Sequence, residues 1–384
     1  MKTILYVWRS MALLAGIERV ICIKLNWLVS HGYKVVLVTY EQGSHPVIQP
    51  LHPDVTIIDL RTPFYSLSKY PLNSRLLKYI KMKNCFYKRL KEVVKEYRPD
   101  LVITIAGSMN VIKEIYRACH NSKLIIESHE TFFSVMKETQ YNSSLLLRNI
   151  AKLYDKRNLN IINHFDLMVC LTYGDASEWH KHVSTKIEVI PNPLDTFPIL
   201  GDNSIKETHF RLISAGRIED VKGYDRLINA FALIADYCPN WRLDIYGKGS
   251  REDFLRKLIA HFRLENRIAI FPPTNRIYTE YMNSDIYVLS SLHEGLGMVL
   301  LEAMSCGISC VAFNCDYGPR EIIQDGVTGL LVEDGNVEKL AQAMIWMIEH
   351  PKERIEMGIK ARESVAKYHI NTIMPIWIKL FNEL

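Results

Sequence analysis

Short apolar runs alternate with longer amphipathic stretches along most of the chain. Runs of this kind, separated by helical stretches, are typical of parallel sheets covered by helices on both faces. The runs form two series, which predicts two α/β domains, each with a doubly wound sheet. The predicted strands cover 3–8, 34–39, 101–106, 123–128, 167–172 and 186–190 in the first series, and 210–216, 241–247, 267–271, 286–290, 309–313 and 329–332 in the second.

A segment rich in Pro, Gly and Asn separates the two series. It reads IPNPLDTFPILGDNS over residues 190–204 and fits neither periodicity, which indicates a linker. We therefore place one Rossmann-like domain at 1–192 and a second at 193–366. A final helix is expected over 367–384, packed back on the first domain.

The composition is that of an ordinary globular protein, with 48% apolar and 23% charged residues in a chain of 384. Arg9, Glu18 and Arg19 interrupt the apolar N-terminus before a signal-peptide core can form, and no later run reaches eighteen uninterrupted apolar residues. The eight cysteines are scattered without a CxxC pair, which favours free thiols in a reducing compartment. We expect a cytoplasmic protein that does not cross a membrane.

The densest candidate chemistry is EGLGMVLLE, from Glu294 to Glu302, directly after a predicted strand. Gly295 and Gly297 allow the backbone to approach a ligand, and the helix predicted at about 297–305 offers unpaired N–H groups to a phosphate. Glu302 lies where it can accept hydrogen bonds from ribose hydroxyls. Two glutamates at this spacing are by themselves usually solvent-facing, but the preceding strand and both glycines favour a binding site.

A second candidate block is SAGRIEDVKGYDRLINAF, which leaves the first strand of the second domain and precedes a helix. Arg217 and Lys222 are expected at the carboxyl end of that strand, where ligands bind in open α/β sheets. Two cations in a loop are by themselves more often solvated side chains, so their position alone leaves both interpretations open.

These two blocks resemble the retaining GT-B glycosyltransferases of family 4, whose carboxylate-x7-carboxylate motif has the form of Glu294–Glu302. VIPNPLD at the linker, IYGKGS at 245–250 and NCDYGPREIIQDGVTGLLV at 314–332 are similar to the same family, so the resemblance covers most of the chain. In the first domain, LLAGIERV resembles the family's glycine-rich turn with only Gly16 present, and IIESHE places His129 just beyond a strand. A lone histidine is more often structural.

The resemblance implies a GT-B fold, in which two Rossmann-like domains face each other across a cleft that binds the donor diphosphate. The first domain would be the acceptor side, and the second would bind the nucleotide sugar. Arg217 and Lys222 would hold the departing diphosphate, and Glu302 would hold the ribose. The remaining contacts would come from Glu294 and the backbone of Gly295, Leu296 and Gly297 to the sugar, from Gly16 near the diphosphate, and from His129 beside the sugar.

The sequence offers no obvious metal site. No Asp-x-Asp occurs, which removes the usual metal-diphosphate clamp of the other large glycosyltransferase fold. Cys306, Cys310 and Cys315, beside His293, lack the paired spacing of a zinc site. No nicotinamide-type GxGxxG follows the first strand. We expect transfer without a metal or a further cofactor, with the charge of the diphosphate compensated by the two cations and the helix near Gly297.

The sequence therefore predicts a retaining, metal-independent hexosyltransferase. Its donor would be a nucleoside-diphosphate sugar, with a UDP-sugar favoured, and its acceptor a hydroxyl of a glycan or lipid-linked glycan in cell-surface polysaccharide synthesis. One alternative is a sugar-nucleotide epimerase or hydrolase on the same fold. Another is a non-catalytic GT-B-like binding protein, against which the intact set of Arg217, Lys222, Glu294 and Glu302 speaks.

The net charge of +5 is concentrated in one segment, since residues 69–98 hold ten Lys or Arg and two Glu. Leu76, Leu77, Ile80 and later apolar residues follow helical spacing within it. A core-facing helix with a solvated basic face explains this pattern as well as a peripheral contact with an anionic membrane does. No nucleic-acid-binding module accompanies the charge, so we expect no nucleic-acid partner.

Overall fold

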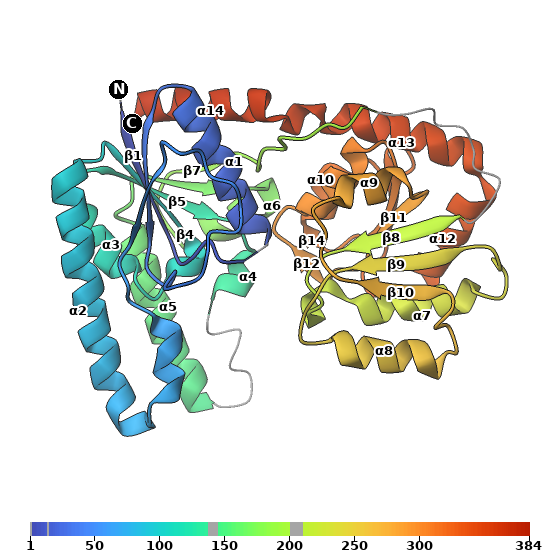
Figure 1. Ribbon diagram of the computed structural model, residues 1–384, viewed down its shortest axis with the longest axis horizontal. Coiled ribbons are helices and arrows are strands. Elements are labelled where there is room, and N and C mark those ends of the chain that lie inside the picture. Colours follow the sequence, from blue (N-terminus) through green and yellow to red (C-terminus); the bar gives the residue numbers. More distant parts are fainter. Residues whose placement is uncertain (1, 14, 137–144, 200–209) are drawn as a thin grey trace. The chain divides into compact units, whose positions relative to one another are not determined.

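The computed structural model describes residues 2–13, 15–136, 145–199 and 210–384 (Figure 1). The last five residues of the predicted linker, 200–204, lie outside the described residues. The chain forms two compact units. Unit 1 comprises Met1–Pro193 and Ile373–Leu384, and unit 2 comprises Leu194–Thr372.

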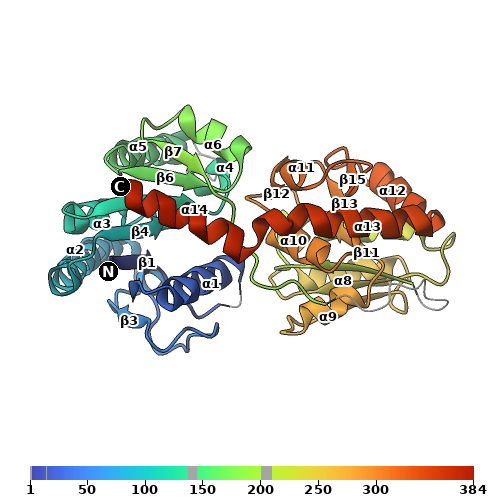
Figure 2. The same cartoon turned by 90° about the horizontal axis from the view of Figure 1, so that it is seen from above.

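Unit 1 is built on a seven-stranded parallel sheet with the strand order β3-β2-β1-β4-β5-β6-β7. Helices α1 and α14 cover one face, and α2, α3 and α5 cover the other (Figure 1, Figure 2). The strands are β1 (Thr3–Trp8), β2 (Lys34–Thr39), β3 (Thr56–Asp59), β4 (Leu101–Ile105), β5 (Lys123–Ser128), β6 (Leu167–Cys170) and β7 (Ile187–Val189). The helices are α1 (Gly16–Ser30), α2 (Leu72–Tyr97), α3 (Ile112–Cys119), α4 (Phe132–Val135), α5 (Leu145–Ile162), α6 (Tyr173–His180) and α14 (Ile370–Glu383).

Unit 2 repeats this design with a six-stranded parallel sheet in the order β10-β9-β8-β11-β13-β15. A separate pair of short parallel strands, β12 (His293–Glu294) and β14 (Asp316–Tyr317), lies outside the main sheet. The main strands are β8 (Arg211–Ala215), β9 (Arg242–Tyr246), β10 (Ile268–Phe271), β11 (Ile286–Leu289), β13 (Ser309–Phe313) and β15 (Gly329–Val332). The helices are α7 (Tyr224–Ile234), α8 (Glu252–His261), α9 (Ile277–Met282), α10 (Met298–Ser305), α11 (Gly318–Ile322), α12 (Val337–Glu349) and α13 (Pro351–Val365).

The α/β class with two doubly wound sheets is confirmed. All twelve predicted strands are present, and their ends lie within two residues of the predicted ones. The prediction missed β3, an edge strand, and the two-residue strands β12 and β14. These are short and carry polar residues, so no apolar run marks them.

The C-terminal helix contributes to the core of unit 1. Its side chains Trp377 and Phe381 are buried. The Nζ of Lys24, on α1, lies 3.6 Å from the centroid of a Trp377 ring, a cation–π contact. The last residues of the chain thus cover the face of the sheet that carries α1.

Helix α2 differs from the core-facing helix that the spacing suggested. Its second half packs on the sheet through the buried residues Phe86 and Leu90, but Leu76, Leu77 and Ile80 in its first half are exposed. The helix has 26 residues. Neither it nor any other helix in the described ranges is apolar enough over a sufficient length to cross a bilayer.

Candidate functional site

Strands β8 and β11 are parallel neighbours in unit 2, so their carboxyl ends meet at one edge of the sheet. Arg217 lies two residues beyond β8, and Glu294 lies five residues beyond β11. The sheet order therefore brings the two predicted blocks together. All the site residues predicted for the second domain belong to unit 2, namely Arg217, Lys222, Glu294, Gly295, Leu296, Gly297 and Glu302.

Lys222 and Glu294 form an ion pair that joins the two blocks. The distance from Lys222 Nζ to Glu294 Oε1 is 2.6 Å, and the side chains are 16% and 11% exposed. Ser291 donates a hydrogen bond from its Oγ to the same carboxylate oxygen, also at 2.6 Å. The motif interpretation assigned both charged residues but did not foresee that they bind each other, and it did not single out Ser291.

The turn that carries Lys222 depends on the glycine that follows it. Gly223 has a φ of 58°, in the left-handed region. A Cβ at this position would lie 2.2 Å from the carbonyl oxygen of Ser290, so no other residue fits without moving the backbone. Ser290 in turn donates from its Oγ to the carbonyl oxygen of Lys222 at 2.9 Å. Gly223 thus holds the lysine turn against the chain that leaves β11.

We expect Ser291→Ala to lower kcat/KM about tenfold, because a hydrogen bond to a charged group is lost while Lys222 still pairs with Glu294. Ser291→Thr should keep most activity, since it keeps the hydroxyl. The matched control is Ser364→Ala on α13, where the hydroxyl bonds only a local carbonyl oxygen. Unchanged steady-state kinetics in Ser291→Ala would show that this hydroxyl does not position Glu294.

Gly297 forms the N-cap of α10 with a φ of 91° and a ψ of 57°, a conformation that favours glycine. The helix runs from Met298 to Ser305, as predicted. Leu296 is 3% exposed and anchors the preceding loop in the core. The first N–H groups of a helix have no partner within it, so this end can donate to an anion.

Glu302 and Arg217, two further predicted site residues of unit 2, differ in exposure. Glu302 is 5% exposed on α10. Arg217 is solvent-exposed, and within the described ranges no hydrogen bond or ion pair holds its guanidinium group. Arg217 can therefore reorient toward a ligand. Glu302 is almost shielded from water, and a hydrogen bond between it and a ligand would be stronger for that reason.

Two further glycines allow the loops beside the site to pack closely against each other. A Cβ on Gly247, in the family-like IYGKGS stretch, would lie 2.0 Å from the carbonyl oxygen of Gly216. A Cβ on Gly318 would lie 2.3 Å from the carbonyl oxygen of Leu296. These glycines allow neighbouring loops to pack backbone to backbone beside the blocks that carry Arg217 and Glu294.

In unit 1, His129 is enclosed by a buried polar network. Its Nε2 lies 2.7 Å from Glu127 Oε2, its Nδ1 lies 3.4 Å from Asn192 Nδ2, and its side chain is 1% exposed. Glu127 also receives hydrogen bonds from Lys24 Nζ and the Tyr6 hydroxyl, each at 2.6 Å. Burial acts to raise the pKa of Glu127, but Lys24 and His129 outweigh it and hold that pKa at about 2. Both ring nitrogens of His129 are thus engaged within the protein.

Gly16 opens α1, after β1 and the connecting turn. A Cβ on this glycine would meet nothing within 4 Å, and its φ is not in the left-handed region. The packing of unit 1 therefore does not itself require glycine here. Leu14, in the same predicted turn, lies outside the described residues.

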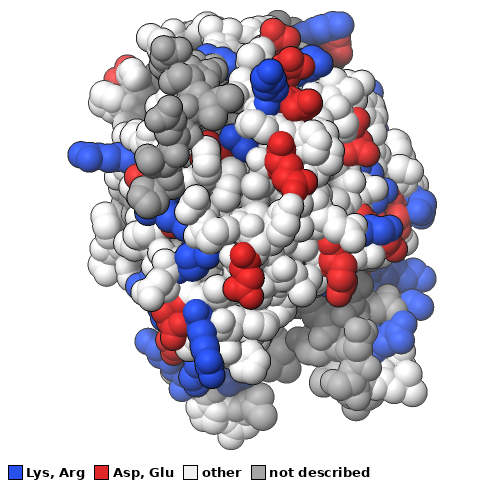
Figure 3. Space-filling model, turned by 90° about the vertical axis from the view of Figure 1, so that its right-hand side faces the viewer, with Lys and Arg blue, Asp and Glu red and all other residues white. Residues whose placement is uncertain are grey.

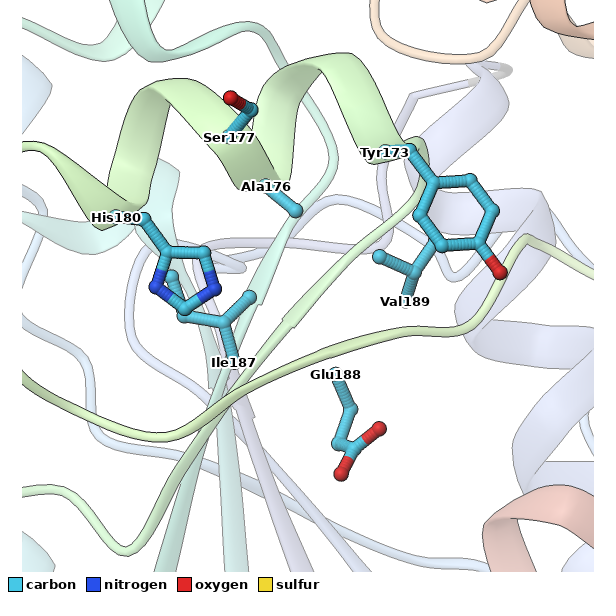
Figure 4. A pocket seen from close by; sticks show the side chains of 7 residues that line it. All are labelled: Tyr173, Ala176, Ser177, His180, Ile187, Glu188 and Val189. Carbon is cyan, nitrogen blue, oxygen red and sulfur yellow. The ribbon is translucent and has the colours of Figure 1, made fainter.

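A pocket of about 400 Å³ lies elsewhere in unit 1, between α6 and β7 (Figure 4). The side chains of Tyr173, His180 and Glu188 are among those that line it. No predicted site residue lines this pocket, and we assign it no role.

The cysteines near the site are not arranged to bind a metal. Cys306, Cys310 and Cys315 are all buried, and burial raises the pKa of the Cys306 and Cys315 thiols to about 12. In the part of the chain that the structure describes, no three His, Cys, Asp or Glu side chains form a group that could hold a metal ion.

Two family matches cover both units. Residues 197–364 match the family Glycosyl transferases group 1, and residues 14–196 match Glycosyltransferase Family 4. The chain belongs to the group 1 glycosyltransferases of family 4. The strand-end blocks with Arg217, Lys222 and Glu294 all fall inside the first of these matches.

This glycosyltransferase is similar to glycosyltransferases from bacteria along its whole length. An uncharacterized glycosyltransferase of Haemophilus influenzae is 28% identical over 380 residues, covering 98% of this chain and 99% of that protein. The amylovoran biosynthesis glycosyltransferase AmsD of Erwinia amylovora is 24% identical over 375 residues, covering 96% of each. The crystal structure of a Staphylococcus aureus TarM mutant, in complex with fondaparinux, alpha-GlcNAc-glycerol and UDP, superposes with a TM-score of 0.78 at 16% identity over all of both chains, which confirms the GT-B fold.

Proposed function

We propose that this glycosyltransferase moves a sugar from a UDP-sugar to a hydroxyl of a glycan or lipid-linked glycan, in the synthesis of a cell-surface polysaccharide. The observation that carries the proposal is the meeting of Arg217, the Lys222–Glu294 pair and the start of α10 at one sheet edge of unit 2. Cations and a helix N-terminus together suit a diphosphate. AmsD is named for amylovoran biosynthesis, and the TarM structure contains UDP and α-GlcNAc-glycerol, which supports this choice of substrates.

The diphosphate is the leaving group, so negative charge grows on it as the bond to the anomeric carbon breaks. We assign Arg217 and Lys222 to that charge, with the N–H groups at the start of α10. Lys222 then faces both the diphosphate and Glu294, which fixes the lysine head by the 2.6 Å contact. These groups supply the charge compensation that a metal ion gives in other enzymes, so the proposed transfer needs none.

The other contacts follow from the same assignment. Glu302 holds the ribose, and Glu294 with the backbone of Gly295, Leu296 and Gly297 holds the sugar. Gly16 leaves room for the diphosphate beside α1. The Nδ1 atom of His129 binds the sugar and gives up its contact with Asn192 Nδ2, which is long at 3.4 Å. The acceptor oxygen takes the anomeric position with retained configuration, and we assign no enzymic nucleophile.

We also propose that the protein acts at the cytoplasmic face of a membrane through a peripheral contact of residues 69–98. This segment has a net charge of +8, ten basic minus two acidic residues, in a chain whose total is +5. Anionic lipids attract such segments. On the face shown in Figure 3, by contrast, basic and acidic side chains are interspersed.

The proposal predicts that UDP raises the melting temperature, because a ligand that binds only the folded state stabilises it. UDP-, GDP- and ADP-sugars should rank with the UDP-sugars first. With a UDP-sugar and a glycan acceptor, proton NMR should show a product with the donor's anomeric configuration. The rate should be unchanged in excess EDTA.

Three outcomes would contradict parts of this proposal. A product with inverted anomeric configuration would contradict the proposed retention. The proposed metal independence would be contradicted if EDTA abolished activity and magnesium or manganese restored it. Consumption of the UDP-sugar without transfer to any acceptor would favour the epimerase or hydrolase. A thermal shift with no turnover at all would favour the binding protein.

A further inference from the structure

The first half of α2 exposes three large apolar side chains to solvent. Leu76, Leu77 and Ile80 are 65%, 71% and 49% exposed. The later turns of the helix pack on the sheet through Phe86 and Leu90, which are fully buried, while Tyr79 and Met82 in the first half are partly buried against the same core. The core of unit 1 therefore leaves the three apolar residues of the first turns uncovered.

Helix α5 repeats this arrangement in its first turns. Leu145, Ile150 and Leu153 are 77%, 55% and 70% exposed, while Ala151 and Asp155 face the protein and are buried. The described residues contain six exposed leucines, and four of them lie on these two helices: Leu76, Leu77, Leu145 and Leu153 here, against Leu13 and Leu233 elsewhere. This concentration marks an interaction surface rather than scattered surface residues.

The two apolar segments belong to the same side of unit 1. α2 and α5 lie on the same face of the sheet, and the starts of both helices extend beyond it (Figure 1). Helix α3 packs against both α2 and α5 and so joins them on this face. The exposed apolar residues all lie among the first nine residues of their helices, at the ends that extend beyond the sheet.

Basic residues accompany the apolar ones, with almost no acidic partners. Residues 69–91 contain eight Lys or Arg and no Asp or Glu, and α5 contains four Lys or Arg and one Asp, the buried Asp155. Within the described ranges, Lys83 is the one basic residue of 69–91 that forms an ion pair, with Glu114 at 3.0 Å. We call the set Leu76, Leu77, Lys78, Ile80, Lys81, Leu145, Ile150, Lys152, Leu153 and Lys156 the α2–α5 surface.

We propose that the α2–α5 surface inserts its leucine and isoleucine side chains into an anionic lipid bilayer, with its lysines at the lipid headgroups. Lysines and arginines around exposed leucines match such a boundary, which is apolar on one side and negatively charged on the other. A second copy of this chain fits less well, because a symmetric contact would set two basic surfaces against each other. The inference rests on the peripheral contact proposed above, and adds α5 and the entry of apolar side chains.

The test is co-sedimentation of the full chain with phosphatidylcholine vesicles and with vesicles that also contain phosphatidylglycerol. We expect binding at least tenfold tighter to the anionic vesicles. Two variants should each bind the anionic vesicles at least tenfold more weakly than wild type. They are the apolar variant Leu77→Ser/Ile80→Ser/Leu153→Ser and the charge variant Lys78→Ser/Lys81→Ser/Lys152→Ser. The matched controls are Leu233→Ser/Ile359→Ser and Lys257→Ser/Lys360→Ser, all at exposed positions of unit 2, which should bind like wild type.

A second measurement reports insertion directly. Leu77→Trp keeps an apolar side chain, and its added fluorescence should be quenched by brominated acyl chains, whereas that of Leu233→Trp should not. Wild-type binding by the apolar variant, without quenching at position 77, would overturn insertion and leave a purely electrostatic contact. A wild type that stays in the supernatant, or a dimer that the apolar variant converts to monomer, would overturn the membrane assignment. Transfer to a soluble acceptor should be the same in all these variants, so failure of the surface and failure of the transferase assignment are distinguishable.

Discussion

Alanine in place of Lys222 is expected to lower kcat at least tenfold, about 1.4 kcal/mol of transition-state stabilisation, while the protein stays folded. The lysine is assigned to the diphosphate, and its charge matters most when the sugar leaves. Arg217→Ala should have a similar effect, and its interpretation is simpler because the exposed side chain supports no other contact of the fold. Steady-state kinetics at saturating donor and a circular-dichroism melt measure both effects.

The Lys222–Glu294 pair provides an internal control. Lys222→Ala leaves Glu294 charged and held only by Ser291, so activity could fall for that reason alone. Lys222→Ala/Glu294→Gln removes this charge. If the lysine acts on the diphosphate, the double variant stays at least tenfold below Glu294→Gln alone; equal activity in these two variants would mean that Lys222 serves only to neutralise Glu294. Lys257→Ala, at an exposed position of α8, is the matched control and should be fully active.

Methionine in place of Lys24 is expected to lower the free energy of unfolding of unit 1 by about 3–5 kcal/mol, because a buried charge loses its partner. Lys24 and Glu127 are 2% and 1% exposed, and their charged atoms lie 2.6 Å apart. For a unit of this size, such a loss lowers the melting temperature by roughly 6–20 °C. Calorimetry measures it, and Lys379→Met, at a lysine that is 80% exposed on α14, should melt like wild type.

A second substitution, at Glu127, shows whether its uncompensated charge causes the loss of stability in Lys24→Met. In Lys24→Met/Glu127→Gln no uncompensated charge remains, so most of the lost stability should return. The pKa of Glu127 falls from 4.5 to about 2 on folding, so its stabilising contribution is present above about pH 4.5 and is lost as the pH falls toward 2. If Lys24→Met had the melting temperature of wild type at neutral pH, Lys24 and Glu127 would not form an ionised pair.

The strands could be predicted because most are buried on both faces. β1, β2, β4 and β5 read as nearly continuous apolar runs, which leave little doubt about their limits. β3, with the sequence TIID at the edge of the sheet, is partly exposed and gives no such signal. Its existence depends on pairing with β2, which is a property of the tertiary structure.

The members of the unit 2 site could be named from the sequence, but not their contacts. Lys222 and Glu294 are 72 residues apart, and the adjacency of β8 and β11 decides that they meet. Gly223 directly precedes a predicted helix, and this position was the one feature of the sequence that pointed to a tight turn there. Ser291 carried no sign at all, since a serine after a strand is common and only the loop geometry aims its hydroxyl at Glu294.

His129 illustrates the opposite difficulty. The sequence placed it beyond β5, but gave no sign of the buried network around its ring, which includes Lys24, more than one hundred positions earlier in the chain. Pairings over such distances leave no periodic trace. The exposed leucines of α2 escaped prediction for the same reason, because helical spacing alone does not tell which turns find a partner.

The division of unit 1 between the two ends of the chain has a consequence for its folding during synthesis. The ribosome delivers residues 194–372 as one continuous piece, so unit 2 can complete its sheet as soon as that stretch has emerged. Unit 1 must wait for Ile373–Leu384, which are made after the whole of unit 2, before Trp377 can cover Lys24. A ribosome that stops before Ile373 would therefore release a molecule whose unit 2 is finished and whose unit 1 still exposes apolar surface beside α1, the form most exposed to chaperones and proteases.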